Sequence, residues 1–455
     1  MEELSWKETR PGRWERPQSC LEKINLLNRN VPKALDRDNW AKTAVAKLEF
    51  DPALGDPVTA LKIAWKQVRY SFPEIAAFPY NGIYMYRIGD PDQVSLWVSA
   101  TFSVVENTTV DELLGHIPRN EQMMCYFLAD TSEVLIRSPH YRLDARGAIF
   151  CLNKLIQSLA DMYPVLIFGG CANNLSPSID DALDIPLKST PEIEAAVTKR
   201  LAAMEPHRPA LKLTPTITSS LPGVTKRHLI KLSKSETNAI ITSCASASLD
   251  LTAALHAVLI NAVAKLAPPS EAKSFMASFH SDLRILITKD VSTKQAPTSC
   301  TSIITTEVDV SPTTTLESYY SQLAPVYAAG YAPYLQSTNV FNERLAETKY
   351  SKGNVVGESE GRLQPRFASL GILNEQLVRD VGGGLVRVKD FWIGTETLTM
   401  RMMVHTWVWE EQMVFSVCYN ESYWDLALVK KLLSVIQDTL TVELALGGML
   451  AGVTL

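Results

Sequence analysis

The chain lacks the cysteine and histidine patterns that mark disulfide frameworks and metal sites. Its 455 residues contain seven cysteines, an odd number, with no CxxC pair, and several of them stand in apolar runs. The seven histidines form no close pair with another His or with Cys. We therefore expect reduced, buried thiols, as in an intracellular protein, and no zinc or iron site.

The chain also has little excess charge and no long apolar run. Its 44 Lys and Arg residues against 49 Asp and Glu residues give a net charge of −5, and a nucleic-acid backbone needs a basic face instead. No uncharged apolar run reaches the roughly 20 residues of a membrane helix. The first 18 residues show no basic segment followed by an apolar one, so we expect no secretory signal. These absences predict a cytoplasmic protein without a nucleic-acid or membrane partner.

What the chain does contain is the composition of an ordinary globular protein. Hydrophobic residues make up 46% and charged residues 20%, which excludes a disordered, collagen-like or coiled-coil chain. At roughly 150 residues per domain, the length allows two or three domains. Prolines and a Thr/Ser cluster interrupt the pattern between Glu205 and Thr225. We therefore predict a first domain over 1–205, a crossover linker over 206–225 and a second domain over 226–455.

Hydrophobic periodicity predicts alternating strands and helices in both halves. Helices are expected at Val58–Val68, after Asp144, from Thr190, after Ser233, at Leu249–Leu266 and at Tyr423–Leu444. Strands are expected at Gln93–Val105, Glu133–Arg137, Lys226–Leu232, Ser302–Val310, Leu385–Trp392, Leu398–Trp409 and Met413–Tyr419. Both halves are thus predicted to be mixed α/β.

One short segment has chemical content: His140 and Asp144 stand four residues apart between a predicted strand and a predicted helix. An imidazole on a loop held by two rigid elements can act as a general base. The spacing is also met by chance, as a surface His followed by an Asp at a helix N-terminus, where the helix dipole favours a carboxylate. The spacing alone therefore does not decide between the two interpretations.

Further motifs, in their order along the chain, give the sequence a family resemblance. They are Trp6-Lys7-Glu8-Thr9, His140-x-x-x-Asp144 with Arg146-Gly147, Asp282-Leu283-Arg284, Ala368-Ser369-Leu370-Gly371, Asp390-Phe391-Trp392-Ile393-Gly394 and Cys418-Tyr419-Asn420-Glu421. With them the chain resembles the chloramphenicol acetyltransferase-like superfamily of HxxxD acyltransferases over nearly its whole length. Within it the chain is most similar to fungal O-acyltransferases of the trichothecene 15-O-acetyltransferase type and to condensation domains.

The resemblance implies two similar α/β domains of mixed sheets and flanking helices, with a channel at their interface. It implies that His140 takes the proton of an acceptor hydroxyl, which attacks a thioester directly. Asp144 is implied to be structural, paired with an arginine that orients the loop. Arg284 is the candidate, since a bidentate guanidinium fixes a carboxylate well. Arg284 has Asp282 and Asp390 as alternative partners.

Other site assignments are weaker. The segment at Asp390 resembles the DFGWG segment of plant acyltransferases, which supports the channel from a distance; an ordinary turn is the alternative. Thr301 and Ser302 are candidates for stabilising an oxyanion, and His280 is a candidate channel residue. His256 and His405 stand in apolar segments and are interpreted as core or interface residues.

A basic window also marks the region of the predicted crossover. It spans 199–234 and has eight Lys or Arg residues against one Glu. Those charges either meet the phosphates of coenzyme A or form a solvated surface. Residues that hold the cofactor are otherwise not identifiable.

The resemblance predicts transfer of an acyl group from a coenzyme A thioester to a hydroxyl of a secondary metabolite. The acyl group that it implies is acetyl. Three features argue against assembly-line amide synthesis: Pro139 replaces the second His of peptide-forming condensation domains, Ala145 replaces a common Gly, and no carrier domain is seen. The alternatives are a different reaction on the same scaffold, such as a cyclisation or condensation, and a non-catalytic binding protein. We expect a monomer that binds acyl-CoA as a co-substrate and has no permanent cofactor or metal.

Overall fold

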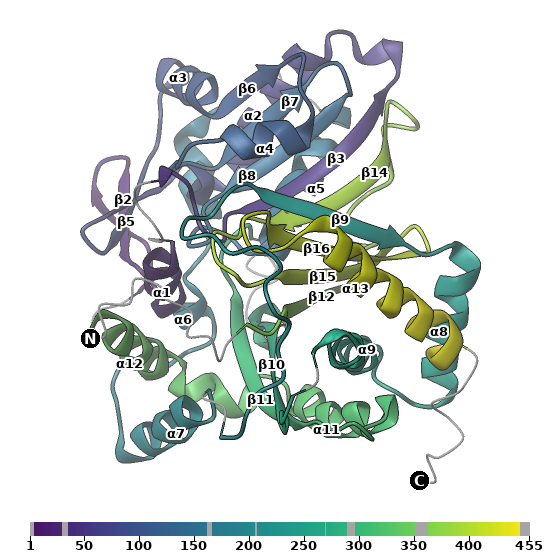
Figure 1. The fold of residues 1–455 in the computed structure, drawn as a ribbon. Helices are drawn as coiled ribbons and strands as arrows, with labels where there is room; N and C mark the ends of the chain where they lie inside the picture. Colours follow the sequence, from purple (N-terminus) through teal and green to yellow (C-terminus); the bar gives the residue numbers. More distant parts are fainter. Residues whose placement is uncertain are drawn as a thin grey trace.

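Two six-stranded mixed sheets form the framework of the protein (Figure 1). The computed structural model describes residues 4–29, 35–161, 166–204, 207–268, 270–288, 296–351 and 363–445. The first sheet has the order β13 (Asp380–Val381), β14 (Val386–Thr395), β3 (Lys42–Phe50), β8 (Glu133–Ser138), β7 (Met124–Leu128) and β6 (Phe102–Val105). The second has the order β11 (Thr301–Asp309), β10 (Ser274–Asp282), β12 (Arg366–Ile372), β15 (Met403–Trp409), β16 (Gln412–Asn420) and β9 (Thr225–Lys231).

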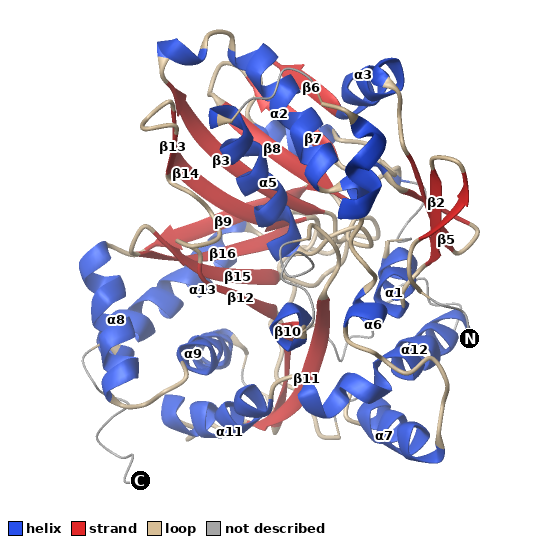
Figure 2. Cartoon of the chain, turned by 180° about the vertical axis from the view of Figure 1, so that it is seen from behind, coloured by secondary structure: helices blue, strands red, loops and turns tan. Residues whose placement is uncertain are grey.

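Helices flank both sheets, and a small third sheet lies beside the first half (Figure 2). The small sheet has the order β1 (Lys7–Arg10), β2 (Arg13–Pro17), β5 (Ile83–Arg87) and β4 (Phe78–Tyr80). The helices of the first half are α1 (Cys20–Asn28), α2 (Pro57–Ser71), α3 (Pro91–Thr101), α4 (Val110–His116), α5 (Ala145–Ala160), α6 (Ile179–Ala182) and α7 (Pro191–Ala202). Those of the second half are α8 (Lys234–Ser246), α9 (Leu251–Leu266), α11 (Leu316–Ala329), α12 (Thr338–Ser351) and α13 (Leu426–Asp438). The mixed α/β fold class is thereby confirmed.

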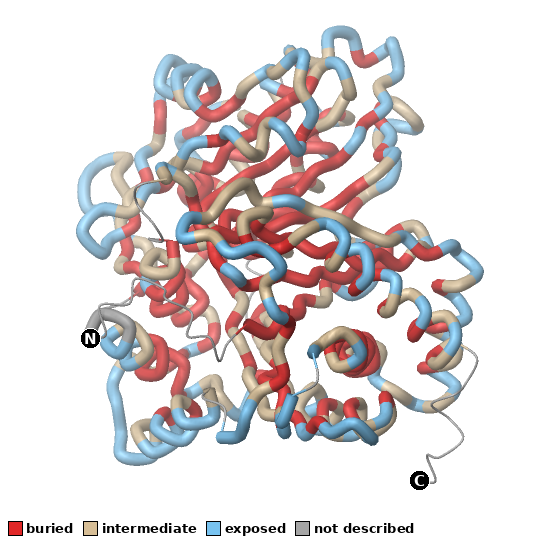
Figure 3. Tube along the Cα trace, in the orientation of Figure 1, coloured by how far each residue is buried: buried red, intermediate tan, exposed pale blue. Residues whose placement is uncertain are grey.

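Local sequence signals explain the helices next to the site and at the start of the second half. Helix α5 begins after Asp144, whose carboxylate accepts the Gly147 N–H, and its apolar face packs on β3. In α8, Ser233 and Glu236 form the predicted capping box. Helix α9 is buried along most of its length, which explains why its sequence is apolar all round. Figure 3 shows buried residues, including much of α9, in red inside the protein.

Strand β14 joins the two halves. It follows the second sheet's β12 in the chain but pairs antiparallel with β3 of the first sheet, as Figure 1 shows with the yellow-green β14 beside the purple β3. The side chains of Trp407 and Trp409, from β15, also pack in the core of the first half. Residues 380–395 therefore complete the first sheet, although the predicted division at 206–225 assigns them to the second domain. A domain boundary drawn along the chain misses this exchange because strand pairing ignores sequence distance.

Two predicted strands differ from the observed elements. The predicted strand Gln93–Val105 is helix α3 followed by the short β6. Asp90 and Gln93 form a capping box and Pro91 occupies the first helical turn, and these signals outweigh the β-branched and aromatic residues that favour a strand. The predicted strand Leu398–Trp409 begins only at Met403.

The length and hydropathy of a helix decide whether it could cross a membrane. No single helix within the described ranges is long and apolar enough to cross a membrane. Only α8 and α9 taken together, bent by 113° where they meet, reach that length and composition.

Candidate active site

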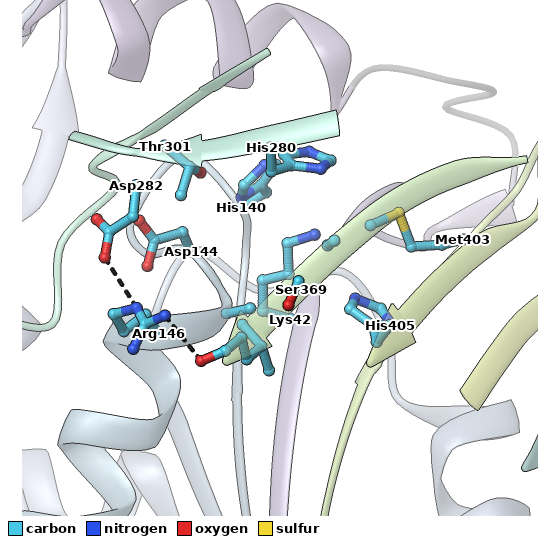
Figure 4. Close-up of a pocket in the computed structure, with 13 residues that line it drawn as sticks. Lys42, His140, Asp144, Arg146, His280, Asp282, Thr301, Ser369, Met403 and His405 are labelled. Carbon is cyan, nitrogen blue, oxygen red and sulfur yellow. Dashed lines mark hydrogen bonds and ion pairs between the residues drawn. The ribbon is translucent and has the colours of Figure 1, made fainter. Parts of the chain in front are cut away.

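A pocket at the junction of the two sheets brings the HxxxD motif together with residues of the second half (Figure 4). It encloses about 430 Å³ of space between atoms, part of which is open to solvent. The residues that line it are Lys42, His140, Asp144, Ala145, Arg146, His280, Asp282, Thr301, Ala368, Ser369, Leu370, Met403 and His405. Both halves of the chain therefore contribute to one site.

His140 has the geometry of a general base. It lies in the loop between the end of β8 at Ser138 and the start of α5. Its Nδ1 lies 3.1 Å from the carbonyl oxygen of Leu143, and because a carbonyl only accepts, Nδ1 carries the hydrogen. The neutral ring therefore has Nε2 as its acceptor. Burial, helped by the charge of Lys42, lowers the pKa of His140 to about 3, so the ring is neutral at physiological pH.

The loop that carries His140 is tied to its surroundings by its next two residues. The Tyr141 hydroxyl donates to the Glu121 carboxylate at 2.7 Å. The Arg142 guanidinium donates to the carbonyl oxygens of Glu121 and Ala77. These bonds hold the imidazole in place, which a base in a bimolecular reaction requires.

Asp144 is held by groups of both halves and has no oxygen left for chemistry. Its carboxylate accepts two hydrogen bonds from Arg284, at 2.9 and 3.1 Å, and one each from the backbone N–H groups of Gly147 and Cys300, at 2.8 and 2.7 Å. Burial by itself would raise the pKa of Asp144, but the Arg284 guanidinium holds it below its usual range. The carboxylate is therefore an ionised structural group.

Arg284 has the predicted partner and one of the two alternatives. It forms the buried pair with Asp144, with side chains 3% and 1% exposed, and it also contacts Asp282 at 3.1 Å. Asp282 in turn pairs with Arg146 at 2.8 Å across the pocket. The carboxylates and guanidiniums of this part of the site thus neutralise one another.

The structure separates the remaining predicted site residues into two groups. Thr301 and His280 line the pocket. The Ser302 hydroxyl instead donates to the Tyr331 hydroxyl at 2.8 Å, away from the pocket lining. Asp390 is half-exposed on β14 and pairs with Lys231 at 2.7 Å, so it is also outside the pocket. Side-chain alternation along strands accounts for Thr301 and Ser302 pointing to opposite faces.

Four of the eight basic residues of the predicted window pair with carboxylates in the structure. Arg208 pairs with Glu307 and Asp309, and Lys226 with Glu421. Lys231 pairs with Asp390, and Lys234 pairs with Glu411. This pattern is that of a solvated surface, the second of the two interpretations.

Sequence reasoning missed three polar side chains of the pocket: Lys42, Ser369 and His405. Lys42 begins a strand whose next four residues, Thr43 to Ala46, carry no charge, and a lysine at the start of such a run is the signal that could have marked it. His405 is fully buried, as interpreted, yet it also lines the pocket. Its Nε2 lies 3.2 Å from Thr395 Oγ1.

The donor set gives no sign of a metal centre. Among the residues that the structure describes, no group of three or more His, Cys, Asp or Glu side chains is placed to hold a metal ion.

Comparison with known proteins identifies the fold. The solved structure of TRI3 trichothecene 15-O-acetyltransferase from Fusarium sporotrichioides superposes with a TM-score of 0.81 at 17% identity, over 96% of this chain and 98% of that one. The chain shares the fold of that acetyltransferase. The α/β fold expected from the resemblance is thereby confirmed.

Sequence similarity points to the same group of proteins. The chain is 28% identical to the acetyltransferase pigO of Monascus ruber, over 97% of this chain and 99% of pigO. It is 26% identical to the O-acetyltransferase pigM of the same fungus, over 97% of this chain and 88% of pigM. No family model matches the sequence.

Proposed function

We propose that this protein is an acyl-CoA-dependent O-acyltransferase that uses His140 as its general base. The observation that carries the proposal is the placement of His140 in a pocket made by both halves, with Nδ1 bound to the Leu143 carbonyl and Nε2 left as an acceptor. Such a ring can take a proton from a hydroxyl at neutral pH. The similarity to acetyltransferases over nearly the whole chain supports acyl transfer as the reaction.

The proposed reaction is direct transfer in two steps. Nε2 of His140 takes the proton of the acceptor hydroxyl as its oxygen attacks the thioester carbonyl carbon, which gives a tetrahedral intermediate. The intermediate collapses, the C–S bond breaks, and the thiolate of coenzyme A receives the proton from His140. The products are the ester and free coenzyme A, and the ring returns to its neutral form.

An acyl-enzyme on the nearby cysteine is disfavoured by its surroundings. Cys300 is buried beside Asp144 and Arg284 and is not part of the pocket lining. Burial, opposed by Arg284, raises its pKa to about 12, so its thiol is a poor nucleophile. This supports direct attack by the acceptor.

The names of the relatives give the proposal its substrates. We infer that the acyl group is acetyl, that the donor is acetyl-CoA and that the acceptor is a hydroxyl of a fungal secondary metabolite. In this proposal the enzyme works as a monomer in the cytoplasm, and acetyl-CoA is a co-substrate rather than a bound cofactor.

The test is transfer by the purified full-length protein. It is incubated with acetyl-CoA and a panel of hydroxylated polyketides and terpenoids, while coenzyme A release is followed with a thiol reagent and products by mass spectrometry. We expect release that depends on one class of acceptor, together with a product carrying one added acetyl group, and loss of both in His140→Ala. Products formed by ring closure or chain joining without acetyl transfer would favour the cyclisation or condensation alternative. Absence of any turnover across the panel would favour the binding protein.

A further inference from the structure

A buried lysine stands in the pocket beside the proposed base. Within the described residues Lys42 is the one buried lysine, with 3% of its surface exposed. Its Nζ donates a 3.1 Å hydrogen bond to Thr395 Oγ1, and it lies 6.0 Å from the centre of the Trp40 ring. An ammonium has three N–H donors, so a single hydrogen bond leaves most of its capacity to donate unused.

Strand register explains why this amine lies next to His140. In β3, Lys42 pairs with Ser138 of β8 on one side and with Thr395 of β14 on the other. His140 follows Ser138 by two residues, at the point where β8 has ended. Figure 4 shows the amino group of Lys42 pointing to the side of the pocket where His140 and His280 lie. The position of the amine is therefore fixed by backbone pairing with two strands.

The charge of Lys42 has no counter-ion in the pocket. Asp144 is taken by Arg284, and Asp282 is taken by Arg146 and Arg284. Within the described chain Lys42 forms no ion pair of its own. A buried charge without a partner destabilises a fold, so this arrangement is better explained by a negative charge that arises during the reaction than by stability.

We propose that Lys42 Nζ donates a hydrogen bond to the oxyanion of the tetrahedral intermediate formed at the thioester carbonyl. The inference rests on the proposed function. When the acceptor oxygen attacks, the carbonyl π electrons move to oxygen, and the N–H of Lys42 stabilises that charge until the C–S bond breaks. A charged donor stabilises an oxyanion more than the neutral hydroxyls of Thr301 or Ser369 do.

The protonation of Lys42 adds a pH signature. The titratable or charged groups that face it are His140, Asp144, His280, Arg366, His405 and Cys418. Burial lowers the pKa of Lys42 to about 7, although Asp144 opposes the shift. The ammonium form is therefore present below about pH 7 and is lost above it, so its contribution to the rate decreases as the pH rises through that value.

The decisive variant is Lys42→Met, which replaces the amine by an unbranched side chain one atom shorter and removes the charge. We expect kcat to fall about 100- to 1,000-fold, as for loss of an oxyanion donor, with KM for acetyl-CoA and acceptor changed less than threefold. We expect a melting temperature equal to or above that of the wild type, because an unpaired buried charge is gone. Lys47→Met, an exposed lysine of the same strand, is the matched control and should change neither quantity.

Lys42→Arg gives a second, independent readout. It keeps a charge that does not titrate below pH 12, so we expect it to retain more activity than Lys42→Met and to lose the alkaline fall in rate near pH 7. The inference is overturned if Lys42→Met keeps wild-type kcat, if its loss is confined to KM, or if its melting temperature falls together with its activity. His140→Ala is measured in parallel: acetyl transfer by the wild type but not by His140→Ala sustains the proposed function even where the Lys42 variants overturn this inference.

Discussion

At the scale of single residues, the site contains one side chain with a ring nitrogen left to accept and one whose oxygens are all bound. His140 has one ring nitrogen bound and the other available, whereas every oxygen of Asp144 is used by Arg284 or by backbone N–H groups. We therefore expect substitution of His140 to affect the reaction rate and substitution of Asp144 to affect the stability of the fold.

Replacing Asp144 by Asn should damage stability first. A buried Arg284 would lose the closer of its two charged partners, and breaking a buried pair typically costs about 3–5 kcal/mol of unfolding free energy. Because the pKa of Asp144 is held below its usual value in the fold, its contribution is complete above the ordinary aspartate pKa, about 3.9, and is lost as the pH falls below it. The free energy of unfolding of wild type and Asp144→Asn, measured by urea denaturation, should thus differ at pH 7 and converge toward pH 3. A constant difference across that range would contradict the ion-pair role.

The pH dependence of the rate should reflect the buried state of His140. Its pKa is lowered to about 3 by burial and by Lys42, so the neutral, basic ring persists well below the usual histidine value of about 6.5. We expect kcat/KM to show no acid limb between pH 5 and 7, and His140→Ala to lose about 10²–10⁴-fold in kcat at every pH in that range. A half-maximal rate near pH 6.5 that is absent in His140→Ala would show a solvated ring instead.

How much of the site could be predicted depends on whether its residues share a local pattern. His140 and Asp144 stand in one motif and Arg284 in another, so the resemblance makes Arg284 a candidate partner of Asp144, with Asp282 and Asp390 as alternatives. The structure shows the pair between Asp144 and Arg284. Lys42 lies about 100 residues before His140 and meets it only through the register of β3 with β8. Ser302 is a candidate only as a hydroxyl early in a strand, and the pleat of that strand turns it away from the pocket. Asp390 belongs to a segment expected to support the channel from a distance, and it lies outside the pocket on β14.

At the scale of elements, the first turn of α5 lies in close contact with the backbone of the second half. A Cβ at Gly147 would lie 3.0 Å from the carbonyl oxygen and 3.2 Å from the nitrogen of Thr298. Those atoms belong to the backbone that also binds Asp144 and Arg284, so the contact cannot relax by rotating a side chain. The glycine after the motif is thus required by the close approach of the second half.

Gly147→Ala should therefore destabilise the protein by about 1–3 kcal/mol, as overpacking in a core does. We expect a lower melting temperature and a lower kcat, because α5 can only make room by moving the loop that carries His140. Gly169→Ala is the control, since a Cβ there meets nothing within 4 Å. If both variants melt with the wild type, the first turn of α5 is less constrained than its contacts indicate.

The helices and strands themselves were mostly readable from local signals, with instructive failures. Caps and apolar faces predicted α5, α8 and α9. The β-branched and aromatic residues of 93–105 predict a strand, but the capping box at Asp90 begins helix α3 there. The pairing of β14 with β3 has no local signal, because a strand's own sequence does not specify which strand it pairs with.

At the scale of the whole molecule, the site exists only when both halves are present. Asp144 binds Arg284 and Arg146 binds Asp282 across the junction, and Glu396 forms ion pairs with Arg37 and Arg137 of the first half. The first sheet also takes β13 and β14 from the second half. Neither half is a self-sufficient unit.

Separately expressed fragments 1–205 and 226–455 should therefore be inactive and poorly soluble. The first would expose an unpaired edge of β3, and the second would expose the apolar residues of β14. We expect no coenzyme A release from either fragment in the assay that detects the full chain, and most of each in the insoluble fraction after expression. Soluble fragment 1–205 with measurable transfer would contradict a shared site.

The place of β14 also governs the order of events while the chain is being made. Thr395 and its partner Lys42 are 353 positions apart, and synthesis proceeds at about 5–20 residues per second. The edge of β3 therefore leaves the ribosome roughly 20–70 seconds before its neighbour. Through that interval the first sheet lacks two of its six strands. Until the last quarter of the sequence is synthesised, the exposed edge of β3 in the nascent chain can therefore pair with another chain.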